Sequence, residues 1–179
     1  VICYAAGTMI LTPHGERPIE KLVAGNLVET ADHGSQQILW SGHRYISFAG
    51  QNPIDATRPI KFTAGCLGDG VPKRDLVVSP QHRVLVRSKI SQRMFNSNEV
   101  LVAAKHLIQL EGVDIAHDIQ SVVYYHFLLS QHEIVLSNGT ETESLYTGPV
   151  AMRSLCPQSR NEILELFPEL KYMTEPPRP

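Results

Sequence analysis

A cysteine near the start of the chain is the residue best placed to do chemistry. Cys3 follows Val1 and Ile2, and small residues and Gly7 come directly after it. A thiolate here can attack the carbonyl of the Ile2–Cys3 peptide bond through a five-membered ring, which turns an amide into a thioester. Because this N-to-S acyl shift is uphill for an unstrained amide, it needs a proton donor for the leaving amine and hydrogen-bond donors for the oxyanion. The competing explanation is that Cys3 is a small buried hydrophobe, as free cysteine usually is.

Two later stretches hold side chains of the kinds that this reaction needs. Ser79 and His82 lie in one tight turn between two apolar runs, which is expected to orient both side chains to the same side. His126 lies within an apolar run, where an unpaired imidazole is costly, and His132 follows in the next turn. The structural alternative is a turn histidine bonded to a backbone carbonyl for His82 and a satisfied core histidine for His126. The candidate catalytic residues are therefore Cys3, Ser79, His82, His126 and His132.

Length and composition limit the classes of protein that the chain can belong to. A chain of 179 residues suits one domain, or one domain with a tail. With 16 basic and 18 acidic residues, the net charge is -2 and no run of either sign favours nucleic acid or a membrane surface. The three cysteines are widely spaced, which indicates neither a disulfide framework nor a zinc site. No apolar stretch approaches the roughly 18 residues of a membrane span. We therefore expect a monomer without metal, cofactor, nucleic-acid or membrane partner.

The elements that must position these residues are short strands joined by turns, which predicts an all-β fold. The expected strands are residues 8–12, 27–30, 36–40, 41–47, 59–63, 75–78, 83–86, 100–107, 119–130 and 134–136, and the 100–107 strand is expected to run into one helical turn at residues 103–106. Residues 16–22 are expected to form a link, and Asn138-Gly139 a turn at positive φ. Residues 161–167 form the only convincing amphipathic helix, and 174–179 a proline-rich end. The predicted organisation is a β domain over 1–150 and an extension over 151–179.

The order and spacing of these stretches resemble a known family, the Hint module of inteins and of hedgehog carboxyl-terminal parts, and most closely the bacterial Hint-2 type. Residues 3–15 are similar to its first block, C-x-x-x-G-T-x-I-x-T-x-x-G. Residues 20–30 resemble the continuation, with Asn26 where aspartate is more usual. Residues 75–86 resemble the T-x-x-H block, with Ser79 in place of threonine and His82 as the family histidine. Residues 124–139 resemble the final strand pair.

The resemblance implies a flattened horseshoe of short β-strands in which the two ends of the active region lie close together. It implies autocatalytic processing, with Cys3 forming a thioester to its own upstream polypeptide. In this scheme His82 protonates the leaving amine, and Ser79 holds that histidine or assists the oxyanion. Water, a thiol, an amine or an alcohol would then resolve the thioester, with His126 as the candidate base.

One departure from the family pattern changes the expected products. Inteins end in His-Asn followed by Cys, Ser or Thr, and cyclisation of that asparagine cuts the carboxyl-side junction. When Asn138-Gly139 is matched to the family N-G pair, these places fall on Glu143 and Ser144, and neither can form a succinimide. The sequence therefore predicts amino-side cleavage without splicing.

Three other classes fit the residues less well. A papain-like protease is suggested by the distance from Cys3 to His132, but the C-G-[SA]-C-[WY] signature is missing. A zinc hydrolase needs H-E-x-x-H, and His132-Glu133 continues to Leu136 where the second histidine belongs. The main alternative is an inactive Hint-like β domain that serves as a binding or assembly module.

Overall fold

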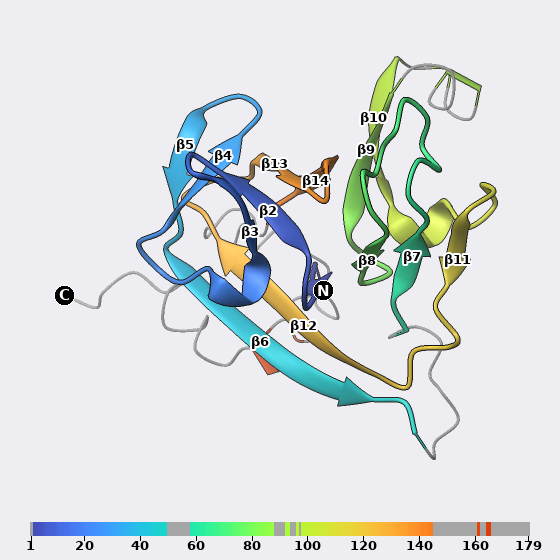
Figure 1. The fold of residues 1–179 in the computed structure, drawn as a ribbon, viewed down its shortest axis with the longest axis horizontal. Helices are drawn as coiled ribbons and strands as arrows, with labels where there is room; N and C mark the ends of the chain where they lie inside the picture. The colour runs from blue at the N-terminus through green and yellow to red at the C-terminus, as the bar shows by residue number, and fades with distance from the viewer. Residues whose placement is uncertain are drawn as a thin grey trace.

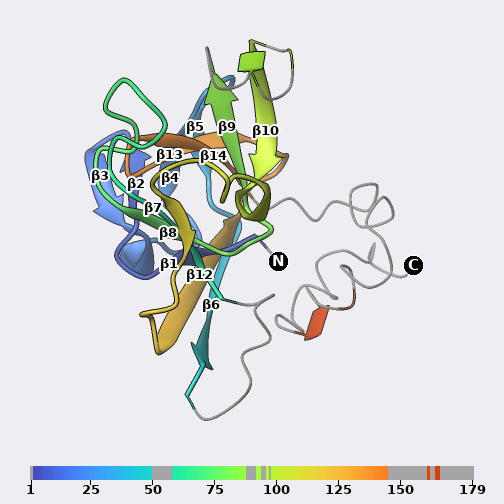
Figure 2. The same cartoon turned by 90° about the vertical axis from the view of Figure 1, so that its right-hand side faces the viewer.

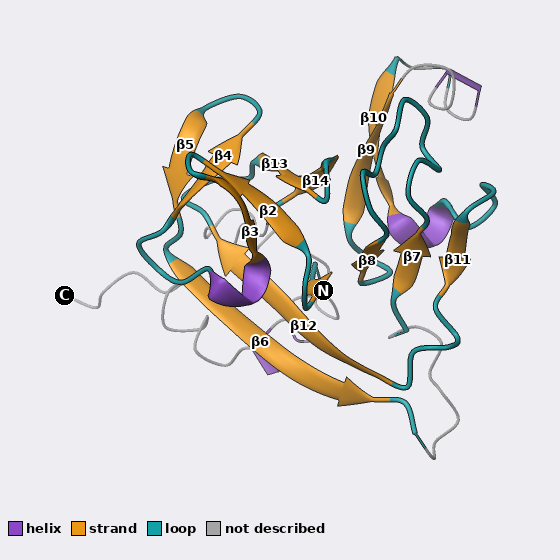
Figure 3. Ribbon diagram, viewed as in Figure 1, coloured by secondary structure: helices purple, strands orange, loops and turns teal. Residues whose placement is uncertain are grey.

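The computed structural model describes residues 2–49, 58–87, 92–93, 96, 98–144, 161 and 164–165. Within these ranges the chain folds almost entirely into antiparallel strands that form two sheets (Figures 1 and 3). The strands are rich in β-branched and aromatic residues, which pack well on a pleated, half-buried surface. The all-β class predicted from the sequence is confirmed.

The first sheet places the start of the chain at its centre. Its strand order among the described residues is β11-β7-β8-β1-β12-β6. The bounds are β1 (Tyr4–Ala5), β6 (Trp40–Ser47), β7 (Ile60–Phe62), β8 (Leu76–Val78), β11 (Val113–Ile115) and β12 (Ser121–Leu128). Tyr4 pairs with Val78 of β8 on one side and with Tyr125 of β12 on the other. A two-residue strand is thus held from both sides, which fixes the backbone next to Cys3.

The second sheet brings the end of the described β region back to the start. Its described strands follow the order β10-β9-β14-β13-β2-β3, with β4 joined to β13 and β5 to β4. The bounds are β2 (Met9–Thr12), β3 (Gly15–Pro18), β4 (Leu27–Thr30), β5 (Gly34–Gln37), β9 (Arg83–Arg87), β10 (Glu99–Ala103), β13 (Ile134–Ser137) and β14 (Thr140–Glu143). Asn138 and Gly139 join β13 to β14 at φ values of 47° and 78°, as the sequence predicted.

The two sheets share one main core and leave Cys3 in a smaller one. The main cluster joins side chains of both sheets, among them Ile10 of β2 and Phe62 of β7, which are fully buried. A second cluster holds Cys3 with Phe48, Val122 and Tyr124. Figures 1 and 2 show β6 and β12 as a long two-stranded ribbon. In Figure 1 it runs below strands β2 to β5 on the left and strands β7 to β11 on the right. Cys3 is therefore packed against this ribbon and apart from the main core.

Some local expectations were wrong. Residues 15–18 form β3, because they pair with β2 in full register, and only Ile19–Lys21 makes a short 3-10 turn in the expected link. By contrast, the strand expected to run from Val100 into one helical turn is confirmed, since β10 ends at Ala103 and the 3-10 turn Ala104–His106 follows. Strand β11 was not predicted. Most of the helix expected over 161–167 lies outside the described residues, and its three described residues, Asn161, Leu164 and Glu165, are helical. The proline-rich end lies wholly outside the described residues.

Candidate active site around the Ile2–Cys3 peptide bond

The Ile2–Cys3 peptide bond lies between β8 and β12, in the middle of the first sheet. The Cys3 side chain is only 2% exposed. Since Tyr4 pairs with Tyr125, the antiparallel register sets Cys3 beside His126. On the other side, the chain leaves β8 at Val78 and places Ser79 beside Cys3. The sheet thus brings together residues that are 76 and 123 positions apart in the sequence.

The nitrogen side of the peptide bond is held by Ser79. The backbone N–H of Cys3 donates to Oγ of Ser79 at 3.0 Å, and this contact is buried. The backbone N–H of Ser79 in turn donates to the carbonyl of Cys3 at 3.0 Å. This reciprocal pair fixes the serine hydroxyl on the atom that would become the leaving amine.

The carbonyl side is held by His126. Nδ1 of His126 lies 2.8 Å from the carbonyl oxygen of Ile2 and 3.3 Å from Sγ of Cys3. The shorter contact, to an acceptor, assigns the proton to Nδ1, which donates to the Ile2 carbonyl. Burial lowers the pKa of His126 to about 3, although its bond to Ile2 opposes this effect. At neutral pH the ring is therefore a neutral donor aimed at the carbonyl that the thiol would attack.

Acidification should destabilise the fold through His126. Its pKa is about 3 when folded and about 6.5 when unfolded, so between these values the unfolded chain binds the extra proton. Stability from this group is complete above pH 6.5 and is lost as the pH falls, by about 2 kcal/mol at pH 5. We expect His126→Gln to reduce the loss in unfolding free energy between pH 7 and pH 5 by that amount. Urea titrations at the two pH values measure it, and identical pH dependence in both proteins would contradict the prediction.

His82 lies between two backbone carbonyls. Its Nδ1 is 3.0 Å from the carbonyl oxygen of Cys3, and its Nε2 is 2.8 Å from that of Glu143. The ring is fully buried, with its centroid 4.3 Å from that of Tyr4. Burial lowers the pKa of His82, and the bond to Cys3 and the charge of Glu143 partly offset the effect. His82 thus contacts the carbonyl oxygen of Cys3, while Ser79 contacts its amide nitrogen.

His132 lies apart from this group. Its Nε2 is 3.0 Å from Oε2 of Glu143, and its side chain is 40% exposed. The structure therefore brings together Cys3, Ser79, His82 and His126, whereas His132 is connected to them through Glu143.

Sequence reasoning missed two neighbours of the site. Glu143 was treated only as a residue that cannot cyclise, yet its carbonyl contacts His82 and its side chain is buried. Trp40, the first residue of β6, lies with its ring centroid 5.6 Å from that of His126. The alternation Thr-Glu-Thr-Glu over 140–143 is typical of a solvated strand face, so it gave no sign of a buried carboxylate.

Other candidate sites are weaker. In the part of the chain that the structure describes, no three His, Cys, Asp or Glu side chains gather closely enough to hold a metal ion. None of the described helices is long and apolar enough to cross a membrane.

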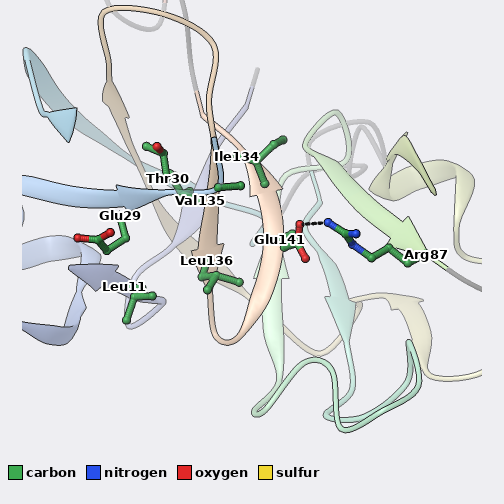
Figure 4. Close-up of a pocket in the computed structure, with 9 residues that line it drawn as sticks. Leu11, Glu29, Thr30, Arg87, Ile134, Val135, Leu136 and Glu141 are labelled. Atoms are coloured by element: carbon green, nitrogen blue, oxygen red, sulfur yellow. Dashed lines mark hydrogen bonds and ion pairs between the residues drawn. The ribbon is translucent and has the colours of Figure 1, made fainter. Parts of the chain in front are cut away.

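Burial raises the pKa of the Cys66 thiol to about 11, which makes it a poor nucleophile. A pocket of about 340 Å³ lies over β13 and the strands beside it, and its lining includes none of the residues around Cys3 (Figure 4).

This fold and site agree with the comparisons with known proteins. A protein-family model described as the Hint domain matches residues 2–149, so the chain belongs to the Hint domain family. Hint and intein domains are self-processing modules, so membership of this family supports self-processing by this chain in general terms. No curated protein matches the chain.

Solved structures show the same fold. The solution structure of a bacterial intein-like domain from Clostridium thermocellum is 18% identical, with 80% of this chain and 98% of that chain covered and a TM-score of 0.52. The MchDnaB-1 intein (N145AA) is 12% identical, with 79% and 99% covered and a TM-score of 0.51. At these identities the likeness concerns the fold alone.

Proposed function

We propose that this domain cleaves its own polypeptide between Ile2 and Cys3 by an N-to-S acyl shift. One observation carries the proposal: buried polar groups contact both sides of this peptide bond, with Ser79 on its nitrogen and His126 on its carbonyl oxygen. The nucleophilic sulfur of Cys3 lies beside His126 as well. Every buried peptide bond needs hydrogen-bond partners, but here both partners are side chains that can donate a proton, and they lie beside the sulfur.

The reaction consumes no co-reactant in its first step. The Cys3 sulfur bonds to the carbonyl carbon of Ile2, the C–N bond breaks, and the amine gains the proton that the thiol gives up. Nδ1–H of His126 stabilises the developing oxyanion, in the role that oxyanion-hole donors fill elsewhere. Ser79 accepts a bond from the amide N–H, and once that nitrogen becomes an amine its hydroxyl can turn to donate. His82, whose ring contacts the carbonyl oxygen of Cys3, is the group that passes the thiol's proton to this amine.

The thioester is then resolved by an external nucleophile, and the flanking segments are not joined. Splicing needs a cyclising asparagine at the carboxyl-side junction, and Glu143 and Ser144 stand at the matched places. The Ser144 hydroxyl also accepts a bond from the Glu133 backbone N–H at 2.9 Å, which engages the serine within the fold. Water, a thiol, an amine or an alcohol therefore accepts the upstream chain.

The test is a fusion of residues 1–179 between two carrier proteins of different mass. After incubation with dithiothreitol or hydroxylamine, we expect a free amino-side carrier and an intact fusion of this domain to the carboxyl-side carrier. Denaturing gels and intact mass would identify both products. A ligated product that contains both carriers would contradict the absence of splicing. A fusion that stays intact in both reagents would refute self-cleavage and favour a Hint-like binding or assembly module.

A further inference from the structure

Glu143, the last residue of β14, is a carboxylate enclosed by the protein. Its side chain is 1% exposed. Oε1 accepts the Arg83 backbone N–H at 3.1 Å, and Oε2 accepts the Arg83 guanidinium at 2.8 and 2.9 Å and Nε2 of His132 at 3.0 Å. Burial acts to raise the pKa of Glu143, but the bonds from His132 and Arg83 hold it below its usual value. The group is therefore a buried negative charge, which is costly unless paired.

The main chain of the same residue holds His82. The carbonyl of Glu143 lies 2.8 Å from Nε2 of His82 and also accepts the Tyr4 hydroxyl at 3.1 Å. Arg83, which binds the side chain of Glu143, is the residue that follows His82. Glu143 thus hydrogen-bonds to two consecutive residues, to Arg83 through its carboxylate and to His82 through its carbonyl. We call the pair Glu143 and Arg83 the clamp.

Two opposing effects act on the protonation of the His82 ring. Both of its nitrogens face carbonyl oxygens, which only accept, so a neutral imidazole can donate to one of them and an imidazolium to both. Burial opposes the charged ring, whereas the carboxylate of Glu143 favours it. The titratable and charged groups around His82 are the N-terminal amine, Cys3, Tyr4 of β1, Arg83 of β9, His126 of β12 and Glu143 of β14.

We propose that Glu143 is a positioning residue that keeps His82 in place as a proton donor to the Cys3 peptide. The clamp fixes the Glu143 carbonyl, which holds the His82 ring. The Glu143 carboxylate balances the positive charge of that ring when it is protonated. The cleavage role of His82 rests on the function proposed above, whereas the effect of Glu143 on His82 does not. The two parts therefore have separate measurements.

The first measurement is the pH–rate profile of cleavage in Glu143→Gln, made in the full chain with an upstream carrier. Removing the negative charge takes away one of the effects that oppose burial, so the His82 pKa falls further and fewer His82 rings carry a proton at neutral pH. We expect the rate at pH 7 to fall about tenfold and the limb that reports His82 to move to lower pH. Loss of packing alone would lower the rate without moving that limb.

The matched control is Glu141→Gln. Glu141 lies on the same strand and pairs with Arg87 at 2.8 Å; both line the pocket in Figure 4 and are partly exposed. We expect its profile to match the parent, since a partly exposed pair contributes little.

The second measurement is an NMR titration of the His82 ring, which needs no cleavage. In Glu143→Gln the midpoint should fall. In Arg83→Gln, which removes the positive half of the clamp from a half-exposed position, it should rise. The second variant keeps the inference testable if the first fails to fold.

These readouts separate the two proposals. Unshifted midpoints, or shifts of the same sign in both variants, would overturn the role of Glu143 even if cleavage proceeds. Shifts of opposite sign without any cleavage would leave that effect standing and refute the proposed function instead.

Discussion

Replacing Cys3 with alanine is expected to abolish cleavage at the Ile2–Cys3 bond. The sulfur is the only atom of that residue able to take the acyl group, so its loss leaves the amide without an intramolecular nucleophile. A fusion with an upstream carrier, incubated in dithiothreitol, should release the carrier from the parent and remain intact in Cys3→Ala. Intact mass spectrometry measures both species in one sample.

Cys66→Ala is the matched control, because Cys66 is a half-buried thiol in a loop and its raised pKa keeps it protonated. We expect this variant to cleave at the parental rate. If Cys3→Ala released the carrier as fully as the parent does, the N-to-S mechanism would be refuted. The cut would then come from another nucleophile or from a contaminating protease.

Replacing His82 with alanine should slow cleavage by about 10²- to 10⁴-fold, the usual contribution of a single acid–base group. Ser79→Ala should cost less, because a hydroxyl assists while the histidine supplies the proton. Ser79 nevertheless makes the direct contact with the Cys3 amide nitrogen, whereas His82 contacts the carbonyl oxygens of Cys3 and Glu143. Single-turnover rates of both variants, measured in the same thiol, decide the order.

Circular dichroism and an unfolding curve must show that both variants keep the fold, since His82 is fully buried. If His82→Ala cleaves within a few-fold of the parent, or Ser79→Ala is the slower of the two, the proton-donor role belongs to Ser79 or to another group.

Much of the architecture follows from local sequence. The hairpin of β4 and β5 is specified by alternating residues around a turn, and the Asn138-Gly139 turn by residues that tolerate positive φ. Both depend on neighbours in the chain, so the sequence alone determines them. Strand β11 escaped prediction because three residues carry too short a pattern, and only pairing with β7 makes them a strand.

The candidate residues were also named by their type and spacing, but their partners were not. Nothing local to Ser79 or His126 indicates that one meets the nitrogen and the other the oxygen of the Ile2–Cys3 bond. That assignment depends on the register of β1 between β8 and β12, which pairs residues far apart in the chain. Glu143 shows the same limit, since a glutamate in an alternating strand is normally solvated and only the return of β14 to β9 buries it against Arg83. The sequence thus determined which groups are available for chemistry, and the pairing of distant strands decided what each one touches, because long-range register is set by the packing of whole sheets.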